Sequence, residues 1–209
     1  MSQYPRIRGV YAVTGVLQGE ALLEAVAAAL RGGVAVVQYR DKGTDPGRRL
    51  AEARFMAAAC RDYGALFIVN DDLELARDSG ADGVHLGRDD ADPATARRRL
   101  GAAALVGVSC YDSLQRARDA QAAGAGYLAF GSVFASGTKP GAPRAPLELF
   151  RQAREQLQLP LVGIGGIRAD NAALVMESGA DAVAIVDALF GAGDVEAAAG
   201  RLSAAVARV

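Results

Sequence analysis

The stretch Phe67-Ile68-Val69-Asn70-Asp71-Asp72 runs from three bulky apolar residues straight into an amide and two carboxylic acids. A short apolar run of this kind is typical of a parallel strand that is buried on both faces. In α/β folds the chemistry lies at the carboxyl ends of such strands. A second acidic pair, Asp89-Asp90, follows the apolar run Val84–Leu86 about one unit later. The sequence therefore predicts that two carboxylate-bearing strand ends meet at one mouth.

The same alternation of elements extends along the chain, with short β-branched runs between longer Ala-, Leu- and Arg-rich segments of helical period. The predicted strands are Gly9–Val13, Val34–Tyr39, Leu66–Val69, Gly83–Leu86, Leu105–Ser109, Tyr127–Phe130, Leu161–Ile164 and Ala182–Val186. The predicted helices are Glu20–Arg31, Pro46–Tyr63, Asp72–Ser79, Pro93–Leu100, Ser113–Ala123, Pro146–Leu157, Asp170–Ser178 and Val195–Ala207. Eight strands in strict alternation with eight helices indicate an α/β fold, a closed (β/α)8 TIM barrel whose parallel strands lie inside a ring of helices.

An open doubly wound sheet is the competing α/β fold. It usually has fewer units and often opens with a glycine-rich dinucleotide loop, and residues 13–20 contain no such loop. No Pro/Ser-rich linker interrupts the chain, and its 209 residues suit one barrel. Residues 1–209 are therefore expected to form a single domain.

Composition excludes several classes of protein. A net charge of −1 gives no electrostatic case for binding nucleic acid or an anionic membrane. No apolar run reaches the roughly 20 residues of a membrane span, and the N-terminus does not resemble a signal peptide. Cys60 and Cys110 are predicted to be buried free thiols, and a single histidine excludes a multi-histidine zinc site. We expect a cytoplasmic protein that acts on small molecules, and a homo-oligomer is compatible with the sequence.

The second strand ends in Gln38-Tyr39-Arg40-Asp41-Lys42. By strand alternation Gln38, Arg40 and Lys42 share one face, and an arginine beside a lysine suits a multiply charged anion such as a diphosphate. An exposed loop with ordinary surface charge is the alternative interpretation.

Carboxylates from neighbouring strand ends are hard oxygen ligands, and one or two of them with substrate phosphates is the usual way to hold Mg²⁺. Asp71 and Asp90 are the predicted ligands. Asp72 can instead cap its helix, and Asp89 can simply face solvent.

His85 lies in the last part of its strand, where either a satisfied core histidine or a hydrogen bond to substrate fits the pattern. Ser109 ends the fifth strand. A single histidine in the chain argues against a hydrolase triad, so Ser109 is better placed as a hydroxyl donor to an anion.

The longest loop, residues 131–144, contains Ser136-Gly137-Thr138-Lys139. Its small residues, hydroxyls and lysine suit a mobile loop that closes over an anionic substrate, although a flexible linker with one stray lysine is the alternative. The last two strands lead into Gly165-Gly166 and Val186-Asp187. Backbone N–H groups after these strands form the recurrent phosphate site of such barrels, which the glycines suit and the Asp187 carboxylate opposes.

These motifs, in this order, resemble those of the thiamine phosphate synthase family over nearly the whole chain. The resemblance rests on five segments: Gln38–Lys42, Asn70–Asp72, Asp82–Gly87, Ser136–Lys139 and Ile164–Ile167. It implies a TIM barrel that joins hydroxymethylpyrimidine diphosphate to hydroxyethylthiazole phosphate and releases diphosphate with Mg²⁺. The implied mechanism is dissociative, in which diphosphate leaves first and the thiazole nitrogen captures a pyrimidine-methyl cation.

The resemblance also implies roles for individual residues. The pyrimidine diphosphate would be held by Gln38, Arg40, Lys42, Asn70, Ser109 and Lys139, and among these Arg40, Lys42, Ser109 and Lys139 are the expected catalytic residues. Mg²⁺ would be bound by Asp71 and Asp90. The thiazole phosphate would be bound by Ser136, Thr138, Gly165 and the backbone of Val186–Asp187. The remaining expected substrate contacts are Tyr39, Asp41, His85, Gly137 and Gly166.

Two positions depart from the family pattern. The family usually has threonine where Ser136 stands, a change that keeps the hydroxyl. It usually has serine where Asp187 stands, and we expect the Asp187 carboxylate to turn away so that only its backbone N–H is used.

Three other functions compete. A thiazole tautomerase is a related barrel that needs no metal-bound diphosphate, and retention of Asp71, Asp90, Lys42 and Lys139 argues against it. A phosphate-sugar isomerase or lyase would need a proton-abstracting pair that the sequence does not offer. A non-catalytic barrel that binds thiamine precursors stays open because of Asp187.

Overall fold

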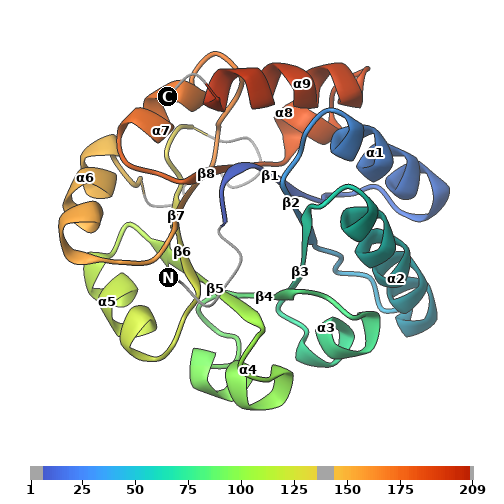
Figure 1. The fold of residues 1–209 in the computed structure, drawn as a ribbon, viewed down its shortest axis with the longest axis horizontal. Helices are drawn as coiled ribbons and strands as arrows, with labels where there is room; N and C mark the ends of the chain where they lie inside the picture. The colour runs from blue at the N-terminus through green and yellow to red at the C-terminus, as the bar shows by residue number, and fades with distance from the viewer. Residues whose placement is uncertain (1–6, 136–143, 208–209) are drawn as a thin grey trace.

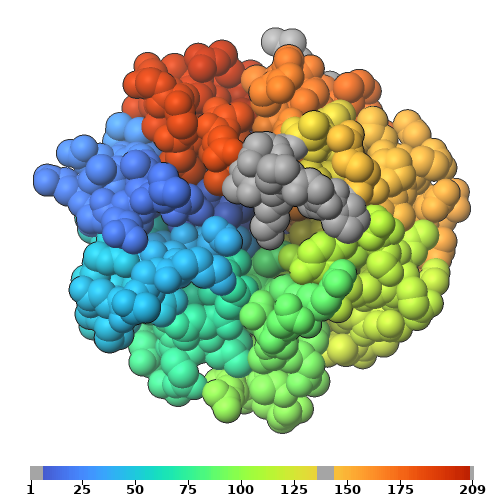
Figure 2. Space-filling model, turned by 180° about the vertical axis from the view of Figure 1, so that it is seen from behind, coloured from blue at the N-terminus to red at the C-terminus, as the bar shows by residue number. Residues whose placement is uncertain are grey.

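The predicted barrel is confirmed. A computed structural model describes residues 7–135 and 144–207 of the chain. Its eight strands form one closed sheet in the order β1 to β8, and β8 pairs with β1 to complete the ring. All eight pairings are parallel, so the carboxyl ends of all strands lie at the same end of the barrel. The helices surround this ring, and the units follow one another around it in chain order (Figures 1 and 2).

The strands are β1 Gly9–Val13, β2 Val36–Tyr39, β3 Leu66–Asn70, β4 Gly83–Leu86, β5 Leu105–Tyr111, β6 Tyr127–Gly131, β7 Leu161–Ile164 and β8 Ala182–Ile185. The helices are α1 Gly19–Arg31, α2 Pro46–Asp62, α3 Leu73–Ser79, α4 Pro93–Leu100, α5 Leu114–Ala122, α6 Leu147–Gln156, α7 Ala172–Glu177, α8 Asp187–Phe190 and α9 Val195–Val206.

Small differences from the predicted bounds have local causes. β2 begins at Val36 rather than Val34, because the N–H of Val34 still bonds to the carbonyl of Ala29 in α1 at 3.2 Å. β5 continues to Tyr111 through an irregular register between Ser109 and Tyr111. Such irregularities re-aim side chains and are common beside active sites.

One short helix was not predicted from the sequence. α8 follows β8 directly and has four residues, too few to show a helical period. Its first residue is Asp187 and its N-cap is Val186. The segment expected to be a plain strand end is therefore a strand-to-helix junction.

Two separate apolar cores hold the barrel together. The inner core fills the barrel with alternate strand residues such as Tyr11, Ile68, Tyr127 and Val162. The outer core joins the other face of each strand to the helices. Burial on both faces explains why the strands read as nearly continuous apolar runs. It also means that every strand offers one set of side chains to the interior and another to the helices.

Several helix starts are fixed by side-chain caps. The carboxylate of Asp72 accepts a hydrogen bond from the N–H of Leu75 at 3.0 Å, which confirms its predicted role as the cap of α3. Cys60 and Cys110 are both buried and free, as predicted. Within residues 7–135 and 144–207, no helix is long and apolar enough to cross a membrane.

Candidate active site at the barrel mouth

A small cavity of about 40 Å³ opens among side chains at the carboxyl half of the strands. Its lining residues are Tyr11, Val13, Gln38, His85, Ser109, Tyr127, Ala129, Val162, Ile164 and Ala184. Three of these were predicted site residues, from β2, β4 and β5. A larger cleft of about 440 Å³ lies outside the barrel along α5, away from the predicted site. Of these two cavities, the one at the barrel mouth is lined by predicted site residues.

Lys42, Asp71 and Asp90 form a cluster that we call the mouth cluster. The ammonium of Lys42 donates to a carboxylate oxygen of Asp71 at 2.8 Å. Asp71 has a φ of 65°, in the left-handed region that aspartate tolerates better than most residues. Its backbone N–H donates to the carbonyl of His85 at 2.9 Å. The backbone of Asp71 is thus tied to β4, while its side chain contacts Lys42 in the loop after β2.

The two carboxyl groups of the mouth cluster interact directly. Partial desolvation and a hydrogen bond with the Asp71 carboxyl raise the pKa of Asp90 above its ordinary value, although the residue is exposed. Burial also acts to raise the pKa of Asp71, but hydrogen bonds from Lys42 and Asp90 outweigh it and lower this pKa. The N–H of Gly87 donates to Asp90 at 2.6 Å and holds it in place. The predicted meeting of the acidic strand ends is therefore present.

A pair of adjacent carboxyls suits a divalent cation that takes its other ligands from water or substrate phosphates. In the part of the chain that the structure describes, no group of three or more His, Cys, Asp or Glu side chains is arranged to hold a metal. The donor set at the mouth thus resembles a magnesium site of the open, two-carboxylate kind rather than an all-protein cage.

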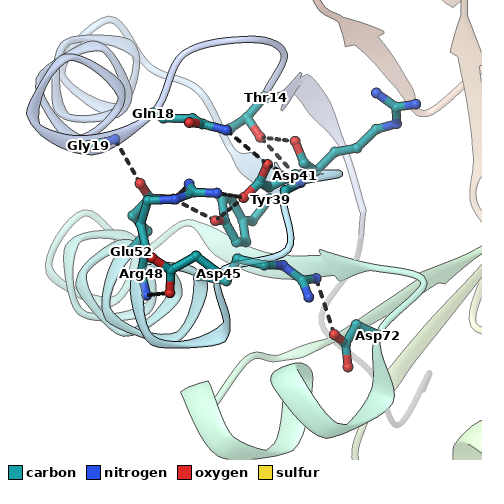
Figure 3. A network of polar contacts seen from close by, with 12 residues as sticks. Thr14, Gln18, Gly19, Tyr39, Asp41, Asp45, Arg48, Glu52 and Asp72 are labelled. Carbon is teal, nitrogen blue, oxygen red and sulfur yellow. Dashed lines mark hydrogen bonds and ion pairs between the residues drawn. The ribbon is translucent and has the colours of Figure 1, made fainter.

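Tyr39 and Asp41 do not join the other predicted residues. The hydroxyl of Tyr39 donates to Glu52 at 2.5 Å and to Asp41 at 3.2 Å. The guanidinium of Arg48 in α2 donates to both acids, and the N–H of Gly19 donates to Glu52 at 2.7 Å. Figure 3 shows this network gathered around Arg48 and Glu52, on the helix side of the strand.

In this placement the side chains of Tyr39 and Asp41 bond to α2 and to each other rather than lining the cavity, and their expected contact with substrate stays a prediction. Tyr39 follows the inward-facing Gln38, so strand alternation turns it outward, into the core between strand and helix. The network instead anchors the loop that carries Arg40 and Lys42. A further pair supports that loop, since Thr14 accepts from the N–H of Arg40 at 2.8 Å.

Inside the barrel a continuous hydrogen-bond chain joins five side chains from five strands. The amide of Gln38 donates to the hydroxyl of Tyr11 at 2.9 Å, and this hydroxyl lies 2.8 Å from that of Tyr127. Nδ1 of His85 lies 3.1 Å from the Tyr127 hydroxyl, and Nε2 lies 2.9 Å from Oγ of Ser109. The sequence reading identified Gln38, His85 and Ser109 but missed the tyrosines. The available signal is one phenol at an inward-facing position of each of two otherwise apolar strands.

His85 fits the satisfied-core alternative, because both of its ring nitrogens have hydroxyl partners within the protein. Its side chain is buried, and burial lowers the pKa of His85 to about 4, so the imidazole is neutral at pH 7. Asn70, its register neighbour on β3, is half-buried at the same level. The polar side chains of β2 to β5 therefore reach the mouth together.

Gly165 and Gly166 pack against the segment that follows β6. Their φ angles are 102° and 63°, and a Cβ on them would lie 2.2 Å from Oγ of Ser132 and 2.3 Å from the carbonyl oxygen of Ala135. The N–H of Phe134 donates to the carbonyl of Gly165 at 2.9 Å. Glycine is required here by backbone conformation and by close approach. This packing gives the double glycine a structural reason beside the expected phosphate site.

The remaining predicted residues fall into two groups. Val186 is half-buried and Asp187 is exposed at the first turn of α8. Ser136, Gly137, Thr138 and Lys139 lie outside the described residues.

Comparison with known proteins shows the family to which the chain belongs. The family model described as "Thiamine monophosphate synthase" matches residues 10–189. The chain is 56% identical to a thiamine-phosphate synthase of Chromobacterium violaceum over 95% of this chain and 96% of that one, and 55% identical to one of Halorhodospira halophila over 98% and 97%. The structure matches a thiamine phosphate pyrophosphorylase from Pyrococcus furiosus with a TM-score of 0.88 and 35% identity, covering 96% of both chains. The chain therefore belongs to the thiamine monophosphate synthase family.

Proposed function

We propose that this protein joins hydroxymethylpyrimidine diphosphate to hydroxyethylthiazole phosphate, giving thiamine phosphate and diphosphate. The observation that carries the proposal is the mouth cluster, in which one ammonium and two interacting carboxyls converge from three strand ends. Membership of the family supports the same reaction. A diphosphate leaving group needs positive charge around it. The mouth cluster offers the Lys42 ammonium and two carboxyls that could hold a divalent cation.

Asp71 and Asp90 would hold Mg²⁺, with the remaining ligands supplied by water and the diphosphate. When bound, the ion would supply positive charge that neutralises the departing diphosphate. Lys42 is placed to add a second positive charge, because it already contacts Asp71. Arg40 precedes Lys42 on the same loop, and we assign Arg40 and Lys139 to the diphosphate as well.

The chain offers charge and position rather than a nucleophile, which favours the dissociative course. The C–O bond to diphosphate breaks first, the bonding electrons leave with the diphosphate, and the thiazole nitrogen then forms the new C–N bond. The cavity holds phenols, an amide, a hydroxyl and a neutral imidazole among apolar side chains. Burial raises the pKa of both cysteine thiols to about 12, so neither supplies a thiolate. Positioning and electrostatic stabilisation would then account for catalysis.

The thiazole phosphate is assigned to the ends of β7 and β8, where Gly165 and Gly166 follow β7 and Val186 leads into α8. We propose that the protein uses the backbone N–H of Asp187 and not its carboxylate. Exposure of that side chain supports this arrangement, because water can screen its charge from the phosphate.

The direct test is to incubate the protein with both precursors and Mg²⁺ and to separate the products by chromatography. We expect stoichiometric thiamine phosphate and diphosphate, and loss of both products when EDTA is added. No product beside an active control enzyme would reject the proposal. Isomerisation of a thiazole carboxylate phosphate without added metal would favour the tautomerase alternative, and tight precursor binding without turnover would favour a non-catalytic binding protein.

A further inference from the structure

We propose that Tyr11, Tyr127 and His85 are positioning residues that set the direction of one hydrogen-bond chain, so that Ser109 presents a hydrogen-bond donor to the substrate. The inference rests on the proposed function only for the identity of that substrate. The hydrogen-bond chain itself consists of residues that the structure describes.

The three positioning residues are almost completely shielded from water. Tyr127 is 0% exposed, Tyr11 is 2% exposed and His85 is 9% exposed. Water therefore does not compete for their polar atoms, and each hydroxyl and ring nitrogen must be satisfied by its neighbours. Ser109 and Gln38 are the two end members of the hydrogen-bond chain, and both line the cavity at the mouth.

The direction follows from counting hydrogens. The amide nitrogen of Gln38 has only hydrogens to give, so the oxygen of Tyr11 accepts there. The hydrogen of Tyr11 then goes to the oxygen of Tyr127, whose own hydrogen goes to Nδ1 of His85. A neutral imidazole has one N–H, which must therefore be on Nε2 and donate to Ser109. The hydroxyl hydrogen of Ser109 is left to point away from His85, toward the cavity.

Reversing part of this chain would be costly. If Tyr127 donated to Tyr11 while Gln38 also donated to it, the hydrogen of Tyr11 would lose its acceptor inside the barrel. A buried donor without an acceptor destabilises the folded protein. Complete reversal avoids this cost only if the Gln38 amide also turns over, so that its oxygen faces Tyr11. The two ends of the chain are therefore coupled: an amide oxygen presented by Gln38 goes with a hydroxyl donor presented by Ser109.

A glycine keeps room for this arrangement. Gly107 on β5 is the register partner of both His85 on β4 and Tyr127 on β6. A Cβ at this position would lie 2.0 Å from Cζ and 2.3 Å from the hydroxyl of Tyr127. Any side chain at residue 107 would push the phenol away from the histidine. The close Tyr127–His85 contact thus depends on the absence of a side chain between them.

The protein contains one histidine, so the tautomer of His85 can be determined from a single pair of ring ¹⁵N signals. Protein without a histidine tag, labelled with ¹⁵N-histidine, is studied by long-range ¹H–¹⁵N NMR at pH 7. We expect the Nε2–H tautomer in the native protein and a mixture of both tautomers in Tyr127→Phe. A matched control is Ser178→Ala, which removes a buried hydroxyl that bonds to the carbonyl of Leu174 at 2.7 Å, remote from this chain. It should leave the tautomer unchanged.

The Nδ1–H tautomer in the native protein, or an unaltered tautomer in Tyr127→Phe, would overturn the proposal. This measurement needs neither substrate nor turnover, so it separates failure of the positioning role from failure of the proposed function. Where turnover is present, a double-mutant cycle supplies the link to Ser109. Tyr127→Phe should lower kcat about tenfold, and adding it to Ser109→Ala should cause no more than a threefold further loss. Independent, multiplying losses would contradict action through Ser109.

Discussion

The ammonium of Lys42 lies 2.8 Å from the carboxylate of Asp71, although the two residues are 29 positions apart in the chain. The lysine side chain is 65% exposed and the aspartate side chain 28% exposed. Exposed ion pairs of this kind contribute about 0–1 kcal/mol to folding, so stability does not explain the contact. A role for the charges in binding an anion explains it better.

Lys42→Met should therefore reduce activity far more than stability. We expect kcat for thiamine phosphate formation to fall by about 100-fold, because the leaving diphosphate loses the positive charge of Lys42 that would stabilise it. The free energy of unfolding in urea should change by less than about 1 kcal/mol. Steady-state kinetics and urea denaturation on the same preparation check both expectations. Equal losses of activity and stability would show instead that the pair is structural.

Asp71→Asn and Asp90→Asn should each weaken the response to magnesium. Both variants remove a charged oxygen ligand, so the Mg²⁺ concentration that gives half-maximal rate should rise at least about tenfold, with kcat strongly reduced. The matched control is Asp89→Asn, which changes the acid next to Asp90 that lies outside the mouth cluster. If Asp89→Asn shifts the magnesium titration as much as Asp90→Asn does, the assignment of ligands is wrong.

Protonation of His85 should destabilise the protein in acid. The folded-state pKa of about 4 lies below the ordinary value of 6.5, so between these values the unfolded chain binds a proton that the folded protein excludes. Stability is therefore complete above pH 6.5 and is lost as the pH falls toward 4, by about 3 kcal/mol from this group. Urea denaturation from pH 4 to 8 should show a shallower pH dependence in His85→Gln than in the native protein. Parallel curves for the two proteins would show that His85 is not the group responsible.

Tyr39→Phe tests the placement of the outer network. Its hydroxyl bonds to Glu52 and Asp41 rather than facing the cavity. We expect the free energy of unfolding to fall by about 1–3 kcal/mol, since a hydrogen bond to a buried carboxylate is lost. KM for both precursors should stay within about twofold, because no substrate contact is removed. A large rise in either KM with unchanged stability would return Tyr39 to the binding site.

The sequence predicted the barrel because every unit repeats the same strong pattern, a short apolar strand and a longer helix. It also predicted that Asp71 meets Asp90 and that Asp72 caps α3, since both follow from position at a strand end. Tyr11 and Tyr127 could not be assigned in this way, because a phenol inside an apolar strand looks like any other core residue. Their role appears only when β1 and β6, which are 116 residues apart at these positions, face each other across the barrel.

Asp187 stands where the family resemblance leads us to expect serine, and at the start of α8 the residue is exposed. Because water screens that charge and the backbone N–H is unchanged by substitution, Asp187→Ser should alter KM for the thiazole phosphate by less than about threefold. The KM for the pyrimidine diphosphate serves as the internal control and should not change. Measurements at low and high salt sharpen the test, because repulsion by an unscreened carboxylate would weaken as salt rises. A sharp fall in the thiazole phosphate KM in Asp187→Ser, largest at low salt, would contradict this expectation. It would show that the Asp187 carboxylate faces the phosphate and weakens binding of the thiazole phosphate.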